Sequence, residues 1–247
     1  MCTVVLLRRP SHAWPVIIGA NRDEAVNRPW QPPGRHWPDR PSVLAGLDEE
    51  AGGSWLGLND AGVVAAILNR QGSLGPARDK RTRGVLVLEA LDHDTARAAA
   101  AATAAVDGRV YRSFNMLIAD REEAFWIRHA GRRGVSAHTL GPGVSMLTAW
   151  DLNDGAASGR TAHYLPRFEA ACPPNPEMPD GWADWEGLFA SEVTGPGDPN
   201  DAMHVRTDWG FGTVSRALLA LPADAQARPV WRFARSWPEI GDYTELH

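Results

Sequence analysis

The chain has 247 residues, 44% of them hydrophobic and 22% charged, and its 25 basic and 30 acidic side chains give a net charge of −5. This is the balance of a globular protein, and a mildly acidic chain lacks the basic face that sequence-independent nucleic-acid binding requires. No apolar run approaches the ~20 residues that cross a bilayer, so we expect no membrane span and a cytoplasmic protein. The two cysteines, Cys2 and Cys172, are too few for a disulfide framework and form no Cys-x-x-Cys zinc motif.

The first seventy residues are typical of β structure. Four apolar, β-branched runs predict two hairpins. The runs are residues 3–7 with 15–20, and 54–58 with 62–69. The second pair flanks Asn59-Asp60-Ala61-Gly62, a turn in which Asn, Asp and Gly tolerate positive φ. Between the hairpins, a polar cluster at 21–24 follows the second run, and a Pro/Trp-rich loop comes after it.

The rest of the chain alternates between helical and β periodicity. Two helices are predicted at 84–91 and 94–106, the second Ala-rich with Asp94 as its N-cap. Four strands follow, at 114–119, 124–129, 134–140 and 144–148. Two more helices are predicted at 163–171 and 184–193, and a closing strand pair at 211–221 and 228–234.

The predicted order is four strands, two helices, four strands, two helices and two strands. Blocks of antiparallel strands alternating with helix pairs favour an α+β fold of two stacked sheets covered by helices. No internal repeat or composition shift divides the chain. We therefore expect a single domain over residues 1–247.

Cys2 is the most informative residue for chemistry. Initiator Met is normally removed when the second residue is small, and removal of Met1 would leave a thiol and a free α-amine on one residue. The amine, with a reference pKa near 8, can act as general base to its own thiol. The thiolate is the reactive form. The alternative is that Cys2 is a small buried residue that opens a strand.

Two further features can complete such a site. A hairpin would bring the 21–24 cluster close to Cys2, where Asp23 could accept a hydrogen bond from an α-ammonium. Arg22 could lower a thiol pKa or bind a substrate carboxylate, although a solvated turn with compensating charges explains the cluster equally. Asn69 ends an apolar strand, where its amide could be a preorganised oxyanion donor. Its alternative is a turn residue before Gln71-Gly72.

Three motifs together resemble the NRDE family, which includes the transport and Golgi organisation proteins. They are Met1-Cys2-Thr3, Asn21-Arg22-Asp23-Glu24 and Gly52-Gly53-Ser54-Trp55-Leu56-Gly57. The resemblance is strong over roughly the first ninety residues and weaker beyond them. It implies an N-terminal-nucleophile (Ntn) hydrolase-like fold, a four-layer αββα sandwich of two antiparallel sheets.

A more distant resemblance to bile-salt hydrolases and penicillin V acylases implies roles for three residues. Cys2 would be nucleophile and base, Asp23 its orienting partner and Asn69 an oxyanion donor. Arg22 departs from the acylase pattern, because it adjoins Asp23, whereas the acylase Arg lies three residues before its Asp. Ala149 stands where NRDE relatives often carry an Asn. The residue that takes the place of this Asn is left open between Asp151 and Asn153. The residue that corresponds to the last Arg of the acylase pattern is left open between Arg206 and Arg216.

Two functions remain in view. The first is an Ntn-type cysteine amidohydrolase that cleaves a small amide and requires neither cofactor nor metal. The second, implied by the transport and Golgi organisation relatives, is a non-catalytic protein that binds and traffics haem, acyl-coenzyme A or lipid. The Trp/Pro-rich segment 30–37 and the lost Asn support the second. No phosphate loop, Gly-x-Ser-x-Gly elbow or Cys-x-x-Cys-His haem-attachment motif is present. In both cases the partner is a small molecule.

Overall fold

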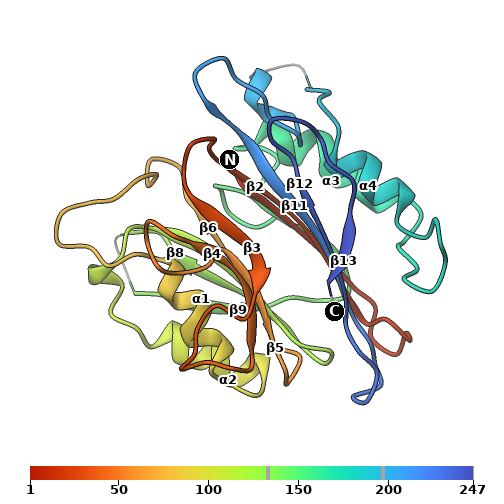
Figure 1. The fold of residues 1–247 in the computed structure, drawn as a ribbon, viewed down its shortest axis with the longest axis horizontal. Coiled ribbons are helices and arrows are strands. Elements are labelled where there is room, and N and C mark those ends of the chain that lie inside the picture. The colour runs from red at the N-terminus through yellow and green to blue at the C-terminus, as the bar shows by residue number, and fades with distance from the viewer. Residues whose placement is uncertain (132–133, 196–197, 247) are drawn as a thin grey trace. The chain divides into compact units, whose positions relative to one another are not determined.

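A computed structural model describes residues 1–131, 134–195 and 198–246. The chain forms two compact units, one of residues Met1–Asn27 and Pro142–His247 and the other of residues Arg28–Gly141. Each unit contains one antiparallel sheet and two helices (Figure 1). Among the described residues, none of the helices has the length and apolarity that crossing a bilayer requires.

The first unit contains a six-stranded sheet in the order β10-β1-β2-β11-β12-β13. Its strands are β1 (Thr3–Arg8), β2 (Val16–Ala25), β10 (Gly143–Leu147), β11 (Phe211–Leu221), β12 (Val230–Arg235) and β13 (Thr244–Leu246). Helices α3 (Gly159–Ala170) and α4 (Ala183–Phe189) pack on this sheet, and the core between them includes Ile17, Leu218, Phe168, Trp185 and Phe189. Burying each such side chain stabilises the fold by roughly 1.5–3 kcal/mol.

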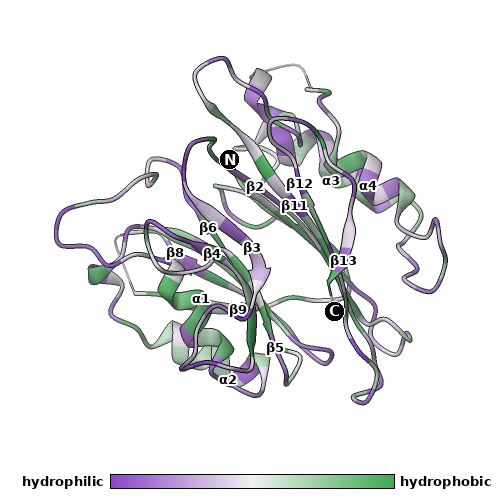
Figure 2. Cartoon of the chain, in the orientation of Figure 1, coloured by the Kyte–Doolittle hydropathy of each residue, from purple (hydrophilic) through white to green (hydrophobic). Residues whose placement is uncertain are grey.

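The second unit contains a seven-stranded sheet in the order β3-β4-β5-β6-β7-β8-β9. Its strands are β3 (Trp30–Gly34), β4 (Val43–Asp48), β5 (Leu56–Asn59), β6 (Val64–Asn69), β7 (Phe114–Ala119), β8 (Ala124–His129) and β9 (Ser136–Thr139). Helices α1 (Gly84–Leu91) and α2 (Ala96–Ala104) cover it. Apolar residues run along α1, whereas the edge strand β3 and most connecting loops are hydrophilic (Figure 2).

Most predicted elements are confirmed. The β1–β2 hairpin forms as expected, and helix α1 and strand β11 occupy the predicted residues. Gly62, in the turn between β5 and β6, has a φ of +88°. This is the positive backbone angle that glycine tolerates and that the predicted turn requires. Strand β11 pairs with β12, as the predicted closing strand pair requires.

Several expectations are wrong in detail. The 21–24 cluster does not follow β2 but lies inside it, because β11 pairs with the whole cluster while β1 reaches Asn21. The Pro/Trp-rich segment predicted as a loop contains strand β3 and is followed by β4, and a short strand, β13, closes the chain. The N-cap of α2 is Thr95, whose side chain accepts a hydrogen bond from the Ala98 amide at 3.2 Å, and not Asp94. Helix α3 begins at Gly159, four residues before the predicted start.

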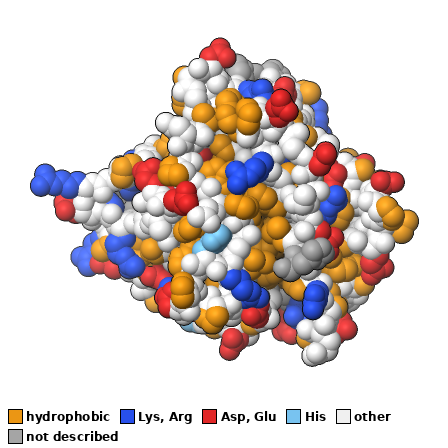
Figure 3. Space-filling view, viewed as in Figure 1, with side chains coloured by type: hydrophobic (Ala, Val, Ile, Leu, Met, Phe, Trp, Pro, Cys, Tyr) orange, Lys and Arg blue, Asp and Glu red, His pale blue; other side chains and the backbone are white. Residues whose placement is uncertain are grey.

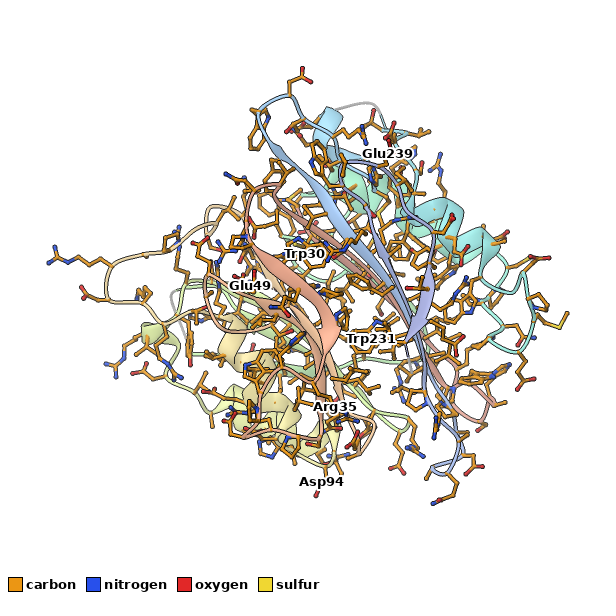
Figure 4. The ribbon with its side chains drawn as sticks, in the orientation of Figure 1. Trp30, Arg35, Glu49, Asp94, Trp231 and Glu239 are labelled. Atoms are coloured by element: carbon orange, nitrogen blue, oxygen red, sulfur yellow. The ribbon has the colours of Figure 1, made fainter. Side chains whose placement is uncertain are left out.

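Tryptophan side chains serve packing in both units. Trp30 on β3, labelled in Figure 4, meets Trp55 edge to face with 5.7 Å between ring centroids. Trp37 donates its indole N–H to the main-chain oxygen of Gly52 at 3.3 Å. Trp231 on β12, also labelled in Figure 4, is 1% exposed. These tryptophan side chains therefore contribute to packing within their own units.

Candidate functional site

The chain begins beside the polar end of β2. Strand β1 pairs with β2 in a register that places Thr3 opposite Asn21. The α-ammonium of Met1 donates to Asp23 Oδ2 at 2.9 Å, and the Cys2 thiol donates to the main-chain oxygen of Asp23 at 3.4 Å. The structure therefore brings together the chain's amine, its first thiol and the acid that the sequence analysis assigned to them.

Asp23 is a buried carboxylate held by three donors. Thr213 on β11 donates its hydroxyl to Oδ1 at 2.7 Å, and Arg160 on α3 donates from Nη1 to Oδ2 at 3.0 Å, beside the Met1 ammonium. Burial alone would raise the pKa of Asp23, but the ammonium, Arg160 and the Thr213 hydroxyl outweigh it and lower the pKa below its usual value. Asp23 is thus ionised throughout the neutral range.

Cys2 is half-buried and is not activated while Met1 precedes it. Burial raises the pKa of the Cys2 thiol, the negative charge of Asp23 raises it further, and the nearby ammonium only partly opposes them. The thiol is therefore protonated at neutral pH. A base must take its proton before Cys2 can act as a nucleophile.

Arg160 is one of two residues of this site that the sequence analysis missed, the other being Thr213. Its side chain is fully buried, and Nη1 donates to the Thr3 hydroxyl at 2.8 Å and to the main-chain oxygen of Met1. Nη2 donates to the main-chain oxygen of Asn200 at 2.8 Å. One guanidinium therefore ties helix α3 to the chain's first residues and to the carboxylate of Asp23.

The other members of the 21–24 cluster have different surroundings. The Asn21 amide donates to the main-chain oxygens of Phe189 and Met203 at 3.0 and 2.8 Å, so it fastens β2 to α4 and to the segment before β11. Arg22 is buried, with Nη2 3.9 Å from Glu24 Oε2. Arg22 thus follows Asn21 and precedes Asp23 on β2, with an acidic neighbour of its own, and its role in the site stays a prediction.

Asn69 lies at the end of β6, in the second unit, and pairs with Phe114 of β7. It is half-buried. Within the described part of the chain its side-chain amide makes no hydrogen bond. Its role as an oxyanion donor stays a prediction.

Of the alternatives left open between Asp151 and Asn153 and between Arg206 and Arg216, three have partners that can be described. Asn153, with φ +56°, accepts the Met146 amide on Oδ1 at 2.7 Å and so holds the loop after β10 against that strand. Arg206 is half-exposed, with its guanidinium 5.4 Å from the centroid of the Trp237 ring. Arg216 is buried and donates to Ser236 Oγ at 2.9 Å.

A family model described as Transport and Golgi organisation 2 matches residues 1–162. Transport and Golgi organisation 2 homologues from Bos taurus, Mus musculus and Homo sapiens are 36%, 36% and 35% identical to the present chain, over 130, 114 and 118 residues. These matches cover 50%, 44% and 46% of the present chain. They span less than half of the relatives' own lengths, at 46%, 40% and 41%.

The chain belongs to the Transport and Golgi organisation 2 family. The family match contains Cys2, Asp23, Asn69 and Arg160, whereas Thr213 lies beyond it. The resemblance inferred from the N-terminal motifs is therefore confirmed.

Solved structures with the same fold include an acid amidase and a bile acid hydrolase by name. An N-acylethanolamine-hydrolyzing acid amidase orthologue from Caenorhabditis elegans superimposes with a TM-score of 0.62 at 14% identity, over 91% of this chain and 95% of its own. A mutant of conjugated bile acid hydrolase from Clostridium perfringens superimposes with a TM-score of 0.56 at 11% identity, over 100% of this chain and 92% of its own. A second variant of that enzyme superimposes with a TM-score of 0.56 at 12% identity, over 99% of this chain and 92% of its own. The α+β, Ntn-hydrolase-like fold is thereby confirmed, and at these identities the similarity extends to fold alone.

Arg160 and Thr213 were missed for a common reason. Both reach Asp23 from segments more than 130 positions along the chain, and no local pattern reports such a contact. Ser158 was the available signal for Arg160, because its side chain caps α3 by accepting the Thr161 amide at 3.1 Å. Reading Ser158 as an N-cap would have placed Arg160 on the helix.

Proposed function

We propose that this family member is an Ntn-type cysteine amidohydrolase that cleaves a small, non-peptide amide, with Cys2 as nucleophile after removal of Met1. The observation that carries the proposal is the meeting of the chain's α-amine and the Cys2 thiol at Asp23. A buried carboxylate fixed by Thr213 and Arg160 is suited to orienting an amine. The amidase and bile acid hydrolase that share the fold support the reaction class.

Removal of Met1 is the precondition for the chemistry. It transfers the free α-amine to Cys2, one residue or about 3.8 Å along the chain, and so places base and nucleophile on the same residue. The raised pKa of the Cys2 thiol then matters less, because a neutral amine beside it can take the proton.

The proposed reaction proceeds in two halves. The Cys2 amine takes the thiol proton, and the sulfur attacks the amide carbonyl carbon to give a tetrahedral oxyanion. A main-chain N–H and a side-chain amide, the role that the resemblance gives to Asn69, would stabilise that oxyanion. The C–N bond breaks as the ammonium returns its proton to the leaving nitrogen, which leaves a thioester. Water then attacks the thioester, with the amine as base, and releases the carboxylic acid and the free thiol.

The test uses an acylating or alkylating mimic of an amide, such as a chloromethyl ketone, followed by intact mass and peptide mapping. The chain offers its own control, because Cys172 is exposed and lies outside the site. We expect one rapid adduct at Cys2 in the wild type and in Cys172→Ala. In Cys2→Ala only slow, non-saturable labelling of Cys172 should remain. Cys2 labelling that is absent, or no faster than that of Cys172, would rule out the mechanism.

A second candidate function is non-catalytic binding of haem or of an acylated ligand. It is favoured by the protonated state of the Cys2 thiol while Met1 is present and by the names of the relatives, which refer to transport and Golgi organisation. Titration with haem, followed by the Soret band, tests this function. Saturable binding with equal affinity in Cys2→Ala would favour carriage over catalysis, and a titration without saturation would count against it.

A further inference from the structure

Two cations share one oxygen of the buried carboxylate. The Met1 α-ammonium lies 2.9 Å and Arg160 Nη1 3.0 Å from Asp23 Oδ2. The side chains of Asp23 and Arg160 are both 0% exposed. Arg160 cannot move away from this position easily, because its guanidinium also donates to Thr3 and Asn200.

This arrangement has an electrostatic consequence for the amine. A carboxylate alone stabilises the ammonium form, whereas a second, permanent cation on the same oxygen opposes it. A guanidinium remains charged at all relevant pH values, and burial weakens solvent screening between the groups. The two influences therefore oppose each other at the Met1 amine, and we expect the same opposition at the Cys2 amine once Met1 is removed.

We propose that Arg160 is a positioning residue that keeps the α-amine available as a base by competing with it for Asp23. This inference rests on the proposed function and adds to it the residue that controls the protonation of the catalytic amine. Without Arg160, the full charge of Asp23 would act on the amine and hold it as an ammonium. An ammonium cannot accept the thiol proton, so Cys2 would remain a thiol.

The other groups around the amine do not duplicate this role. Strand β2 contributes Glu24 and Arg22, whose charges lie 3.9 Å apart and oppose each other. Strand β11 contributes Thr213, which is uncharged, and the segment at Asn200 contributes a main-chain carbonyl. Among the described contacts of Asp23, Arg160 is thus the cation that a substitution can remove.

The experiment observes the amine directly. The chain has two cysteines, so labelling with [13Cα]cysteine gives one signal from Cys2 and one internal reference from Cys172. With both thiols capped as methyl disulfides, the amine is the group of Cys2 that titrates. Intact mass first establishes that Met1 has been removed.

The expected result is a shift of the titration midpoint. Arg160→Gln should move the midpoint of the Cys2 signal to higher pH by about 1 unit or more, the size of a nearby charge effect. Arg160→Lys retains the cation and should restore the wild-type midpoint. Arg232→Gln removes a different ion-paired arginine of the same unit and should leave the midpoint unchanged. An unchanged midpoint in a folded Arg160→Gln protein would overturn the inference.

A second pair of variants decides the question if Arg160→Gln does not fold, as loss of one partner of a buried pair can cause. Asp23→Asn and the double variant Asp23→Asn/Arg160→Gln leave no buried carboxylate unpaired. We expect a higher midpoint in the double variant than in Asp23→Asn, and equal midpoints would overturn the inference. Retained Met1 would remove the proposed function and this inference together. A shifted midpoint without amide cleavage would remove the proposed function alone.

Discussion

At the scale of the residue, the site is organised around the charge of Asp23. Its two carboxylate oxygens accept donors from β11, from α3 and from the chain's first residue. A carboxylate of this kind is stabilised in its ionised form, so its interactions contribute to folding only while it is ionised. Stability and the proposed chemistry therefore depend on the same hydrogen bonds.

Thr213→Val should test the hydroxyl that holds Asp23. It removes a hydrogen bond to a buried charge, which costs about 2 kcal/mol at neutral pH. Because the pKa of Asp23 is lowered in the fold, its contribution is present above the unfolded value of about 3.9 and is lost as the pH falls further. Urea unfolding should therefore show the two proteins converging in stability below about pH 4.

Thr213→Ser, which keeps the hydroxyl, is the matched control for that measurement. It should unfold close to the wild type at neutral pH. A Thr213→Val protein as stable as Thr213→Ser at neutral pH would contradict the role assigned to the hydroxyl.

The sequence predicted one part of the site and not another. Cys2 and Asp23 could be placed together because a hairpin fixes which strand ends meet. The cluster Asn21-Arg22-Asp23-Glu24 was expected to follow the strand, but pairing with β11 extends β2 through these polar residues. Arg160 could not be placed, because its role depends on how α3 packs and on no local pattern.

At the scale of the element, strands were missed where their residues are poor strand formers. Strand β3 has the sequence Trp-Gln-Pro-Pro-Gly and is tolerated because it lies at a sheet edge, where proline need not donate, and its pairing with β4 shifts register between Gln31 and Gly34. Strand β13 is three residues long and is also an edge strand. Tertiary pairing determines these strands, and alternation of side chains does not reveal them.

The packing of α4 on its sheet can be tested with two glycines. A Cβ at Gly19 on β2 would lie 2.1 Å from Phe189 Cε2, so Gly19→Ala should cost about 1–3 kcal/mol through overpacking. A Cβ at Gly187, on the exposed face of α4, meets nothing within 4 Å, so Gly187→Ala should stabilise by about 0.5–1 kcal/mol. Thermal unfolding of both variants measures the difference. A tolerated Gly19→Ala would contradict the contact between β2 and α4.

At the scale of the whole molecule, family membership and fold are established while the reaction is proposed. The charge of −5 is spread over a surface on which, on the face drawn in Figure 3, acidic and basic side chains are interspersed. That face presents no extended basic region to a phosphate backbone. A small-molecule partner stays a prediction.

This charge distribution leads to a prediction about nucleic acid. Fluorescence anisotropy with labelled duplex DNA at physiological salt should show no saturation at tens of micromolar protein. We expect the dissociation constant to lie beyond the weak end of the range for non-specific binding. Binding in the micromolar range that weakens steeply with salt would contradict the assignment to small-molecule partners.

The central claim is that the working protein begins at Cys2, with its own amine facing Asp23. Its most direct test is the intact mass of the purified, untreated chain, expressed without an N-terminal tag. The account predicts a mass lower than 26.8 kDa by one methionine residue, with Cys2 as the first residue by N-terminal sequencing. If all of the purified chain retained Met1, the free amine would be on Met1 and not on Cys2, and that result would contradict the proposed catalysis.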